Sequence, residues 1–289
     1  MVVLLATLIA AGTLSQGDVT AASDALRMAG AEPGQGVWLD PGDACDVPFT
    51  GDSARARAAL ETALPGTDVI VQPRDGRVKA LLIADMDSTM ITCECIDELA
   101  DYAGIKPQVA AITEAAMRGE LDFVAALDAR VALLAGMDEG VLEQCRRERV
   151  RLMPGARELV ATMRAYGARA VLVSGGFTAF ADPVGAELGF DRVVANRLVV
   201  AGGRLAGTVE RPVVDAATKL AELRAGGVPA AQVLAVGDGA NDIPMLAAAG
   251  LGVAYRAKPG TIAAAGAAVR HGDLRVLLWA QGIARAAWH

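Results

Sequence analysis

The pattern of hydrophobic and polar positions divides the chain into a short first part and a longer second part. In the second part, apolar runs without alternation end in small or acidic residues, which is typical of strands buried on both faces of a parallel sheet. The clearest runs lie at 80–84, 169–176, 192–195, 232–237 and 251–254. Helical patterns between them provide the crossovers that parallel strands need. The sequence therefore predicts an α/β fold with a parallel sheet for residues 77–289.

The first part, residues 1–76, shows the order strand, helix, strand, strand, helix, strand. The expected strands are 2–11, 37–39, 44–49 and 67–72, and the expected helices are 17–29 and 53–63. This βαββαβ order is that of a small ferredoxin-like α+β unit, and Pro73 to Gly76 form a plausible linker after it. The residues leave open whether the unit senses an effector, mediates a homodimer or is purely structural.

An insertion of several helices at 96–145 follows the first strand of the second part, with breaks near Gly104, Gly119 and Gly136. Such an insertion would lie over the strand ends, where a lid belongs. Gly202 and Gly203 predict a hairpin between 198–201 and 204–209. Further helices are expected at 177–188, 214–224, 243–249 and, closing the chain, 273–287.

Composition and charge restrict the class of function. The net charge of the 289 residues is −7 and no run of Lys or Arg occurs, which disfavours binding to nucleic acid or to an anionic membrane. No apolar run approaches the ~20 residues of a transmembrane helix, and 2–11 lacks the preceding basic residue of a signal peptide. The four cysteines show no repeated Cys-x-x-Cys pattern, so we expect neither a zinc site nor disulfides. A reduced, cytoplasmic protein fits these features.

Polar side chains gather where three of the predicted strands end. Two carboxylates one residue apart at the end of a buried strand are costly unless something neutralises them. A hard cation such as Mg²⁺ would do so and would bring phosphate within reach; the alternative is an ordinary turn that closes the strand. Because parallel strands share one carboxyl edge, we expect these polar residues to meet in one crevice. They are Asp85, Asp87, Ser174, Asp238, Asn241 and Asp242.

Four motifs carry a resemblance to a known family. They are Asp-Met-Asp-Ser-Thr at 85–89, Ser-Gly-Gly-Phe at 174–177, Lys219, and Gly-Asp-Gly-Ala-Asn-Asp at 237–242. In this order, over about 77–280, they resemble the haloacid dehalogenase superfamily, and within it the phosphoserine phosphatases. The resemblance implies a Rossmann-like core with a helical cap at about 94–150 and an ACT-like domain over 1–76. It also implies Mg²⁺-dependent hydrolysis of O-phospho-L-serine to L-serine and phosphate, the last step of serine biosynthesis.

The resemblance assigns roles to individual residues. Asp85 would attack phosphorus to form an aspartyl-phosphate, and Asp87 would act first as general acid and then as general base. Mg²⁺ would be held by Asp85, by the backbone carbonyl of Asp87 and by Asp238. Asp242 would orient a water molecule or Lys219. The expected ligands of the phosphate are Ser174, Gly175, Lys219 and Asn241.

Selectivity for phosphoserine would come from the cap. The resemblance implies that Glu94 would bind the ammonium group of phosphoserine and that Arg130 would bind its carboxylate through two parallel hydrogen bonds. Met117 and Phe123 would close an apolar cover that excludes water. On spacing alone, Met117 and Phe123 are ordinary core residues, and Glu94 and Arg130 are ordinary solvated charges.

Other functions stay open at this point. One is transfer of the phosphoryl group to another hydroxyl, such as that of homoserine, and another is hydrolysis of a different small phosphometabolite. A function of another class is an amino-acid-sensing protein whose catalytic half is inert, although Asp85, Asp87, Lys219 and Asp238 together argue against it. A scaffold with neither activity is the remaining alternative.

Overall fold

The centre of the molecule is a six-stranded parallel sheet with the order β13-β12-β11-β6-β7-β8. The computed structural model describes residues 2–118 and 120–289, without the side chain of Met117. The strands are β6 (Leu81–Ala84), β7 (Arg169–Phe177), β8 (Arg192–Asn196), β11 (Val233–Gly237), β12 (Leu251–Tyr255) and β13 (Ala267–Val269). β6 comes first in the chain and lies in the middle, so the strand order reverses beside it. This sheet confirms the predicted α/β fold class, and ligands bind at such a reversal.

Helices cover both faces of the parallel sheet. Along β6, Leu82 and Ala84 belong to a core cluster on one face, with α7 (Ala156–Ala165), α8 (Thr178–Leu188) and α12 (Val276–Ala280). Leu81 and Ile83 belong to the cluster on the other face, with α9 (Ala216–Ala225) and α10 (Ile243–Ala248). Side chains alternate between the faces of a strand, so a strand buried on both faces needs an unbroken apolar run.

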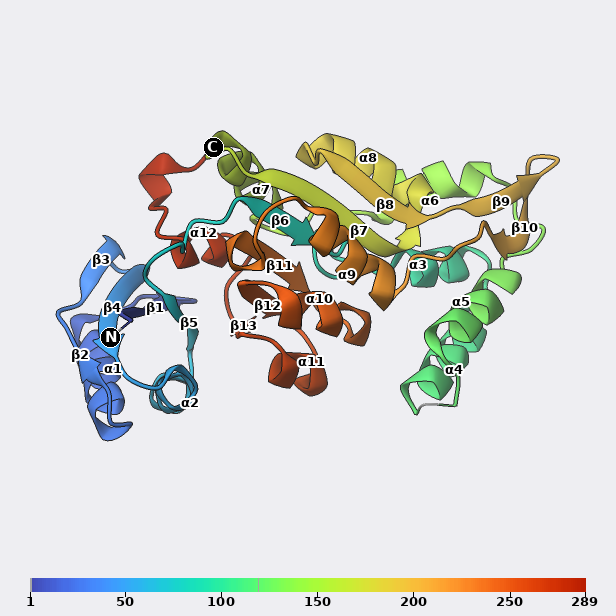
Figure 1. The fold of residues 1–289 in the computed structure, drawn as a ribbon. Helices are drawn as coiled ribbons and strands as arrows, with labels where there is room; N and C mark the ends of the chain where they lie inside the picture. The colour runs from blue at the N-terminus through green and yellow to red at the C-terminus, as the bar shows by residue number, and fades with distance from the viewer. Residues whose placement is uncertain (1, 119) are drawn as a thin grey trace.

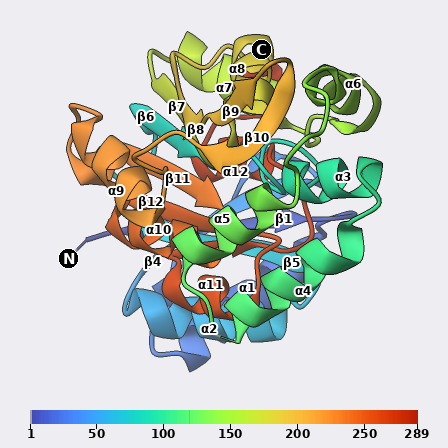
Figure 2. The ribbon, with the colours of Figure 1, turned by 90° about the vertical axis from the view of Figure 1, so that its right-hand side faces the viewer.

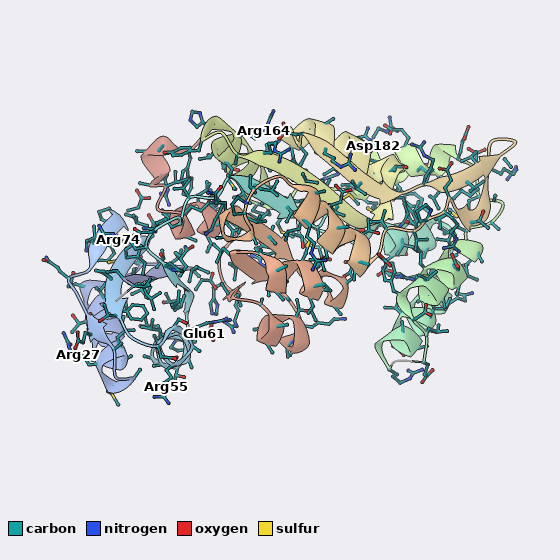
Figure 3. All side chains as sticks on the ribbon, in the orientation of Figure 1. Arg27, Arg55, Glu61, Arg74, Arg164 and Asp182 are labelled. Atoms are coloured by element: carbon teal, nitrogen blue, oxygen red, sulfur yellow. The ribbon has the colours of Figure 1, made fainter. Side chains whose placement is uncertain are left out.

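A separate antiparallel sheet forms the N-terminal unit (Figure 1). β1 (Leu4–Ala10) pairs with β4 (Ala44–Thr50) and β5 (Thr67–Pro73), and the strand outside β4 is split into β2 (Glu32–Pro33) and β3 (Val37–Asp40). One face is covered by α1 (Gln16–Met28) and α2 (Ser53–Ala63). Charged side chains such as Arg27 and Arg55 project outward from these helices (Figure 3). The elements and their order agree with the predicted βαββαβ unit, apart from the split strand.

The N-terminal unit packs against the end of the chain. Ile70 on its second sheet face shares a core cluster with Leu277 of α12. At the edge, the buried Asp68 carboxylate accepts hydrogen bonds from the backbone N–H groups of Arg270 and Gly272, each at 2.7 Å. These apolar and polar contacts join the two sheets into one packed body.

Four helices between β6 and α7 lie at the opposite end from the N-terminal unit (Figure 1). They are α3 (Cys95–Tyr102), α4 (Lys106–Met117), α5 (Phe123–Ala132) and α6 (Gly140–Arg149). Seen from their side, α4 and α5 lie in front of the parallel sheet (Figure 2). The predicted breaks at Gly104 and Gly136 are present, with left-handed φ angles of 67° and 84°. The predicted break at Gly119 lies outside the described residues.

The predicted hairpin braces these helices. It consists of β9 (Leu198–Ala201) and β10 (Arg204–Val209), which form a sheet of their own. The Gly136 N–H donates to the Leu205 carbonyl and the Leu205 N–H donates to the Met137 carbonyl, each at 2.8 Å. Arg211 pairs with Asp128 of α5. The helices are therefore tied to the core by the hairpin as well as by their two chain connections.

The single closing helix predicted at 273–287 is wrong. The structure has α12 and then a 3₁₀ turn, Arg285–Ala287. Between them Gly282 adopts φ 79°, which ends the helix, and a Cβ there would lie 2.8 Å from the Arg77 guanidinium carbon. No pattern predicted α11 (Pro259–Ala264) or β13, because 257–269 is rich in Ala and Gly and its apolar residues follow neither a helical nor a strand period. Among the described residues, no helix combines the length and the apolar character that crossing a bilayer requires.

Candidate active site

A cavity of about 980 Å³ lies at the carboxyl edge of the parallel sheet, between the core and the cap helices. Its lining includes Asp85, Asp87, Asp238 and Asn241, four of the six residues predicted to meet there. The other two, Ser174 and Asp242, are fully buried behind this surface. The predicted crevice is therefore present, and the residues from 85–89, 174–177 and 237–242 do converge. Their chemical roles stay predictions.

The loop after β6 places the two predicted catalytic carboxylates. The strand ends at Ala84, and the loop turns at once: the Met86 N–H donates to Asp85 Oδ1 at 2.8 Å. Ser88 has a left-handed φ of 54°, which is uncommon for a residue other than glycine. Asp85 and Asp87 thus face the cavity because the loop turns, and the period-two rule of a strand does not apply to them.

Lys219 is fully buried between two carboxylates. Its Nζ lies 2.7 Å from Asp85 Oδ1 and 2.6 Å from Asp242 Oδ1. Burial alone would lower the pKa of Lys219, but the two carboxylates outweigh it and raise that pKa above its usual value. Burial, with repulsion from Asp242, also raises the pKa of Asp85 well above its usual value. Lys219 therefore stays charged, and the site favours an additional cation that would keep Asp85 ionised.

Three carboxylates, those of Asp85, Asp238 and Asp242, offer oxygens that all lie within 4.8 Å of one another. Burial and repulsion from Glu94 raise the pKa of Asp238 to about 7. Carboxylate oxygens are the ligands that a hard divalent cation prefers, so this donor set fits Mg²⁺. Asp242 is already used twice, since its Oδ2 accepts from the Gly239 N–H at 2.9 Å and its Oδ1 binds Lys219.

Asp87 has the environment of an acid–base group. Burial, followed by repulsion from Glu94, raises its pKa to about 7. The backbone N–H of Cys95 donates to Asp87 Oδ1 at 3.2 Å and fixes the carboxylate at the start of α3. A carboxyl group whose pKa lies near neutrality can both donate and accept a proton under cellular conditions.

Two glycines at the end of β7 let the backbone approach the carboxylates. A Cβ at Gly176 would lie 2.5 Å from Asp87 Oδ2, and a Cβ at Gly175 would lie 3.1 Å from the Phe123 ring. The buried Ser174 Oγ accepts from the Gly176 N–H at 2.8 Å. No side chain fits at Gly176 without displacing Asp87, so the Gly-Gly pair is a steric requirement of this site.

Two residues that support the site were not predicted. Asn196, 2% exposed at the end of β8, donates to the Gly175 carbonyl at 2.9 Å and accepts from the Val214 N–H at 2.8 Å. Thr89 donates to Asp238 Oδ1 at 3.2 Å. Asn196 belongs to none of the recognised motifs. The only feature of the sequence that could have indicated it is its position as a polar residue directly after a predicted strand.

The cap contributes charged and apolar residues to the cavity. Glu94, Arg130 and Phe123 all line it. Glu94 accepts a hydrogen bond from the Ser88 hydroxyl at 2.6 Å. Burial lowers the pKa of Arg130, an effect that the carboxylates of Asp97, Glu94 and Asp87 oppose. Arg130 is therefore not the solvated charge that its spacing alone indicated, whereas the Met117 side chain lies outside the described residues.

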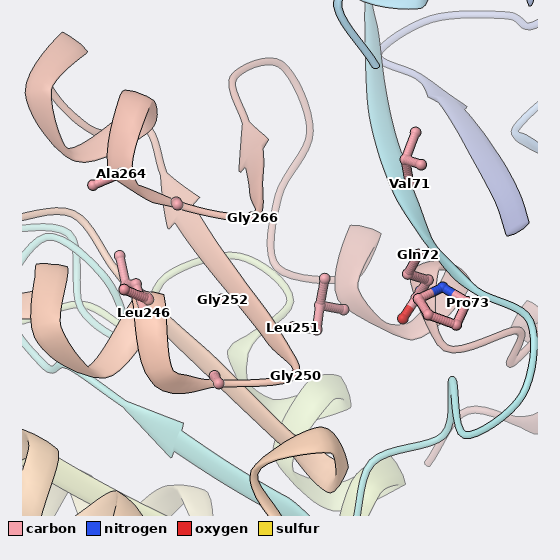
Figure 4. Close-up of a pocket in the computed structure, with 12 residues that line it drawn as sticks. Val71, Gln72, Pro73, Leu246, Gly250, Leu251, Gly252, Ala264 and Gly266 are labelled. Atoms are coloured by element: carbon pink, nitrogen blue, oxygen red, sulfur yellow. The ribbon is translucent and has the colours of Figure 1, made fainter. Parts of the chain in front are cut away.

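A second cavity, of about 310 Å³, lies between β5 of the N-terminal unit and β12 of the core. Figure 4 shows Val71, Gln72 and Pro73 on one side of it and Gly250 and Leu251 on the other. Among the described lining residues no side chain is ionisable. This cavity lacks the groups that acid–base or metal chemistry needs, so the carboxylate cavity is the candidate active site.

Comparisons with known proteins identify a family to which most of the chain is similar. Residues 82–247 match the family described as haloacid dehalogenase-like hydrolase. A phosphoserine phosphatase of Streptomyces coelicolor is 47% identical over 237 residues, which are 80% of this chain and 58% of that protein. One of a Polaromonas species is 44% identical over 225 residues, which are 74% of this chain and 95% of that protein. The chain spans between half and two thirds of several other curated relatives.

Solved structures show the same fold. A probable phosphoserine phosphatase from Vibrio cholerae, in its unliganded form, is 34% identical and superposes with a TM-score of 0.77 over 98% of this chain and 88% of that one. A phospho-aspartyl intermediate analogue of phosphoserine phosphatase is 37% identical, with a TM-score of 0.65 over 70% of this chain and 98% of that one. The first of these similarities extends over both sheets, and the second covers about as many residues as the part of the chain from 77 to 289.

Proposed function

This chain belongs to the haloacid dehalogenase-like hydrolases, and within that family we propose that it is a Mg²⁺-dependent phosphatase that hydrolyses O-phospho-L-serine to L-serine and phosphate. The observation that carries the proposal is the buried contact between Lys219 and Asp85 beside the carboxylates of Asp238 and Asp242. A phosphate monoester resists attack because its anionic oxygens repel a nucleophile. This site combines a carboxylate nucleophile with positive charge at one point.

The first half of the reaction takes place at Asp85. Its Oδ1 already accepts from Lys219 and from the Met86 N–H, so we assign the attack on phosphorus to Oδ2. The Oδ2–P bond forms while the bond from phosphorus to the serine oxygen breaks. Asp87, whose raised pKa keeps a share of it protonated near neutral pH, gives its proton to the leaving oxygen.

The second half clears the aspartyl-phosphate. A water molecule attacks phosphorus, the P–Oδ2 bond breaks, and Asp87 takes the proton of the water. Phosphate then leaves and Asp85 is a free carboxylate again. One carboxyl group can serve both halves because each half leaves it in the protonation state that the next one needs.

Mg²⁺, when bound, would neutralise negative charge on the phosphoryl group and on the carboxylates. Asp85, Asp238 and the backbone carbonyl of Asp87 would hold it. Asp242 is better suited to fixing Lys219, because both of its oxygens already accept hydrogen bonds. Two N–H groups of Lys219 point to Asp85 and Asp242, which leaves the third for a phosphate oxygen. The other proposed phosphate ligands are Ser174, Gly175 and Asn241.

The cap would bind the amino-acid part of the substrate. Glu94 would bind the ammonium group and Arg130 the carboxylate, while Phe123 and Met117 would cover the site. In support, Glu94 and Arg130 line the same cavity as Asp85.

We further propose that residues 1–76 are an ACT-like domain, that 77–289 are the phosphatase domain with a cap at about 94–150, and that the protein works in the cytoplasm. A homodimer through the N-terminal domain stays a prediction.

The test is phosphate release from phosphoserine, phosphothreonine and sugar phosphates, with and without Mg²⁺. The proposal predicts the highest kcat/KM on phosphoserine and no turnover in EDTA. Release that requires homoserine as acceptor would instead identify a phosphotransferase. Serine binding in calorimetry by a protein without turnover would identify a sensor.

A further inference from the structure

One positively charged residue of the cavity has no part in the reaction as described so far. Lys258 lines the cavity from the loop after β12, together with Gly260 and Thr261. It is an exposed residue at the start of α11, where its carbonyl accepts from the Ile262 N–H at 3.1 Å. It therefore lies on the rim of the site rather than in its buried floor.

The loop that carries Lys258 is held in an uncommon conformation. Arg256 has a left-handed φ of 47°, and among the described residues only Ser88 shares this feature without being glycine. The Arg256 N–H donates to the Val269 carbonyl at 2.8 Å, and Pro259 occupies the first turn of α11. Left-handed residues of this kind cost free energy and often mark functional segments. The turn lies at the carboxyl edge of the sheet, where β12 ends, and leads directly to Lys258.

The charged side chains that line the cavity are mostly acidic, so a cation at the position of Lys258 would attract an anionic substrate. Five carboxylates line it, and the cationic side chains among its described lining residues are Arg130 and Lys258. The carboxylates are Asp85, Asp87, Glu94, Asp97 and Asp238. A phosphate monoester carries two negative charges near neutral pH, so it approaches a cavity whose lining is also negatively charged. Arg130 belongs to the cap, whereas Lys258 belongs to the core and lies beside the carboxyl edge of the sheet.

We propose that Lys258 captures the phosphate dianion at the rim of the cavity and directs it from the core side toward Asp85. This inference rests on the proposed function only in that the substrate is a phosphate monoester. A charge that acts during approach changes the rate of productive encounter, and salt screens its effect. Lys258 should therefore influence kcat/KM at low ionic strength much more than kcat.

The experiment compares Lys258→Gln, Lys258→Arg and wild type in kcat/KM on phosphoserine at about 20 mM and about 500 mM salt. Lys106→Gln is the matched control, because Lys106 is an exposed lysine at the start of α4 that does not line the cavity. We expect Lys258→Gln to lower kcat/KM about fivefold or more at low salt and to approach wild type at high salt. Lys258→Arg, which keeps the charge, and Lys106→Gln should stay close to wild type.

A second readout separates this inference from the proposed function. The affinity for inorganic phosphate in the presence of Mg²⁺, measured by calorimetry, does not require turnover of any substrate. Weaker binding by Lys258→Gln alone supports the inference even when phosphoserine is not the substrate. Equal phosphate affinity and equal kcat/KM in wild type and Lys258→Gln at low salt would overturn it, as would a loss that high salt leaves undiminished.

Discussion

Lys219 Nζ and Asp85 Oδ1 lie 2.7 Å apart, although the two residues come from α9 and from the loop after β6; Asp85 lines the cavity and Lys219 is buried behind it. Lys219 is fully buried, so its charge is balanced by neighbouring carboxylates and not by water. In the proposed mechanism, the contact orients the nucleophile through Oδ1 and would place a positive charge beside the phosphoryl group. The proposal therefore links binding of the phosphate to the position of Asp85 through one side chain.

Replacement of this lysine tests that link. In Lys219→Met, Asp85 and Asp242 would face each other without a cation, and breaking a buried pair on one side costs about 3–5 kcal/mol. We expect kcat to fall by about 100-fold or more, and the free energy of unfolding in EDTA to fall by about 3 kcal/mol. Urea unfolding and phosphate release measure these effects. Lys106→Met, at an exposed site, should change neither, and near-normal kcat in Lys219→Met would contradict the role of Lys219.

The stability of the metal-free protein should depend on pH in a defined direction. The pKa values of Asp87 and Asp238 are raised from 3.8 to about 7 in the folded state. The folded state thus binds more protons than the unfolded chain between these values, so stability falls as pH rises from about 4 to about 7. Mg²⁺ competes with those protons. The increase in Tm that Mg²⁺ causes should therefore be small at about pH 5 and large at about pH 8; an equal increase at both would refute this view of the carboxylates.

Arg130 should determine preference among substrates rather than the chemical step. We expect Arg130→Ala to raise KM for phosphoserine by about 10- to 100-fold, since a charged hydrogen-bonded contact is worth about 1.5–3 kcal/mol. Its effect on p-nitrophenyl phosphate, which has no carboxylate, should be within about twofold. Arg146→Ala on α6 is the control, because Arg146 pairs with Glu143 and does not line the cavity. Equal losses on both substrates would rule out recognition of the head group.

Asp68 should anchor the N-terminal unit to the core. Its carboxylate accepts from the N–H groups of Arg270, His271 and Gly272. Asp68→Ala would remove the buried carboxylate that these part-buried N–H groups share. Because hydrogen bonds to a charged group are worth about 1.5–3 kcal/mol, we expect the free energy of unfolding to fall by about that amount with little change in kcat. Asp52→Ala, which removes only the cap of α2, should cost about 1 kcal/mol. A loss no larger than that of Asp52→Ala would show that the contact does not hold the units together.

The strands and the carboxylate loops could be predicted because their signals are local. The run 80–84 shows burial on both faces. Asp85 and Asp238 stand directly after strands, and Asp87 follows Asp85 by two residues. Asn196 also follows a predicted strand, but it belongs to no recognised motif, and its importance comes from contacts with Gly175 and with the Val214 N–H that the local pattern does not reveal. The break at Gly282 was likewise hidden, because a glycine within an apolar stretch does not reveal which side chain will fill the space beside it.

The measurement that tests the central claim most directly is the site of phosphoryl transfer. The enzyme would be mixed with ³²P-labelled phosphoserine and Mg²⁺, quenched in acid within milliseconds, digested and analysed for labelled peptides. We predict label on the peptide that contains Asp85, and neither label nor turnover in Asp85→Asn. This variant should keep its fold because Asn has nearly the same shape and its amide oxygen can still accept from the Met86 N–H. Label on another residue, or turnover by Asp85→Asn near the wild-type rate, would contradict the account.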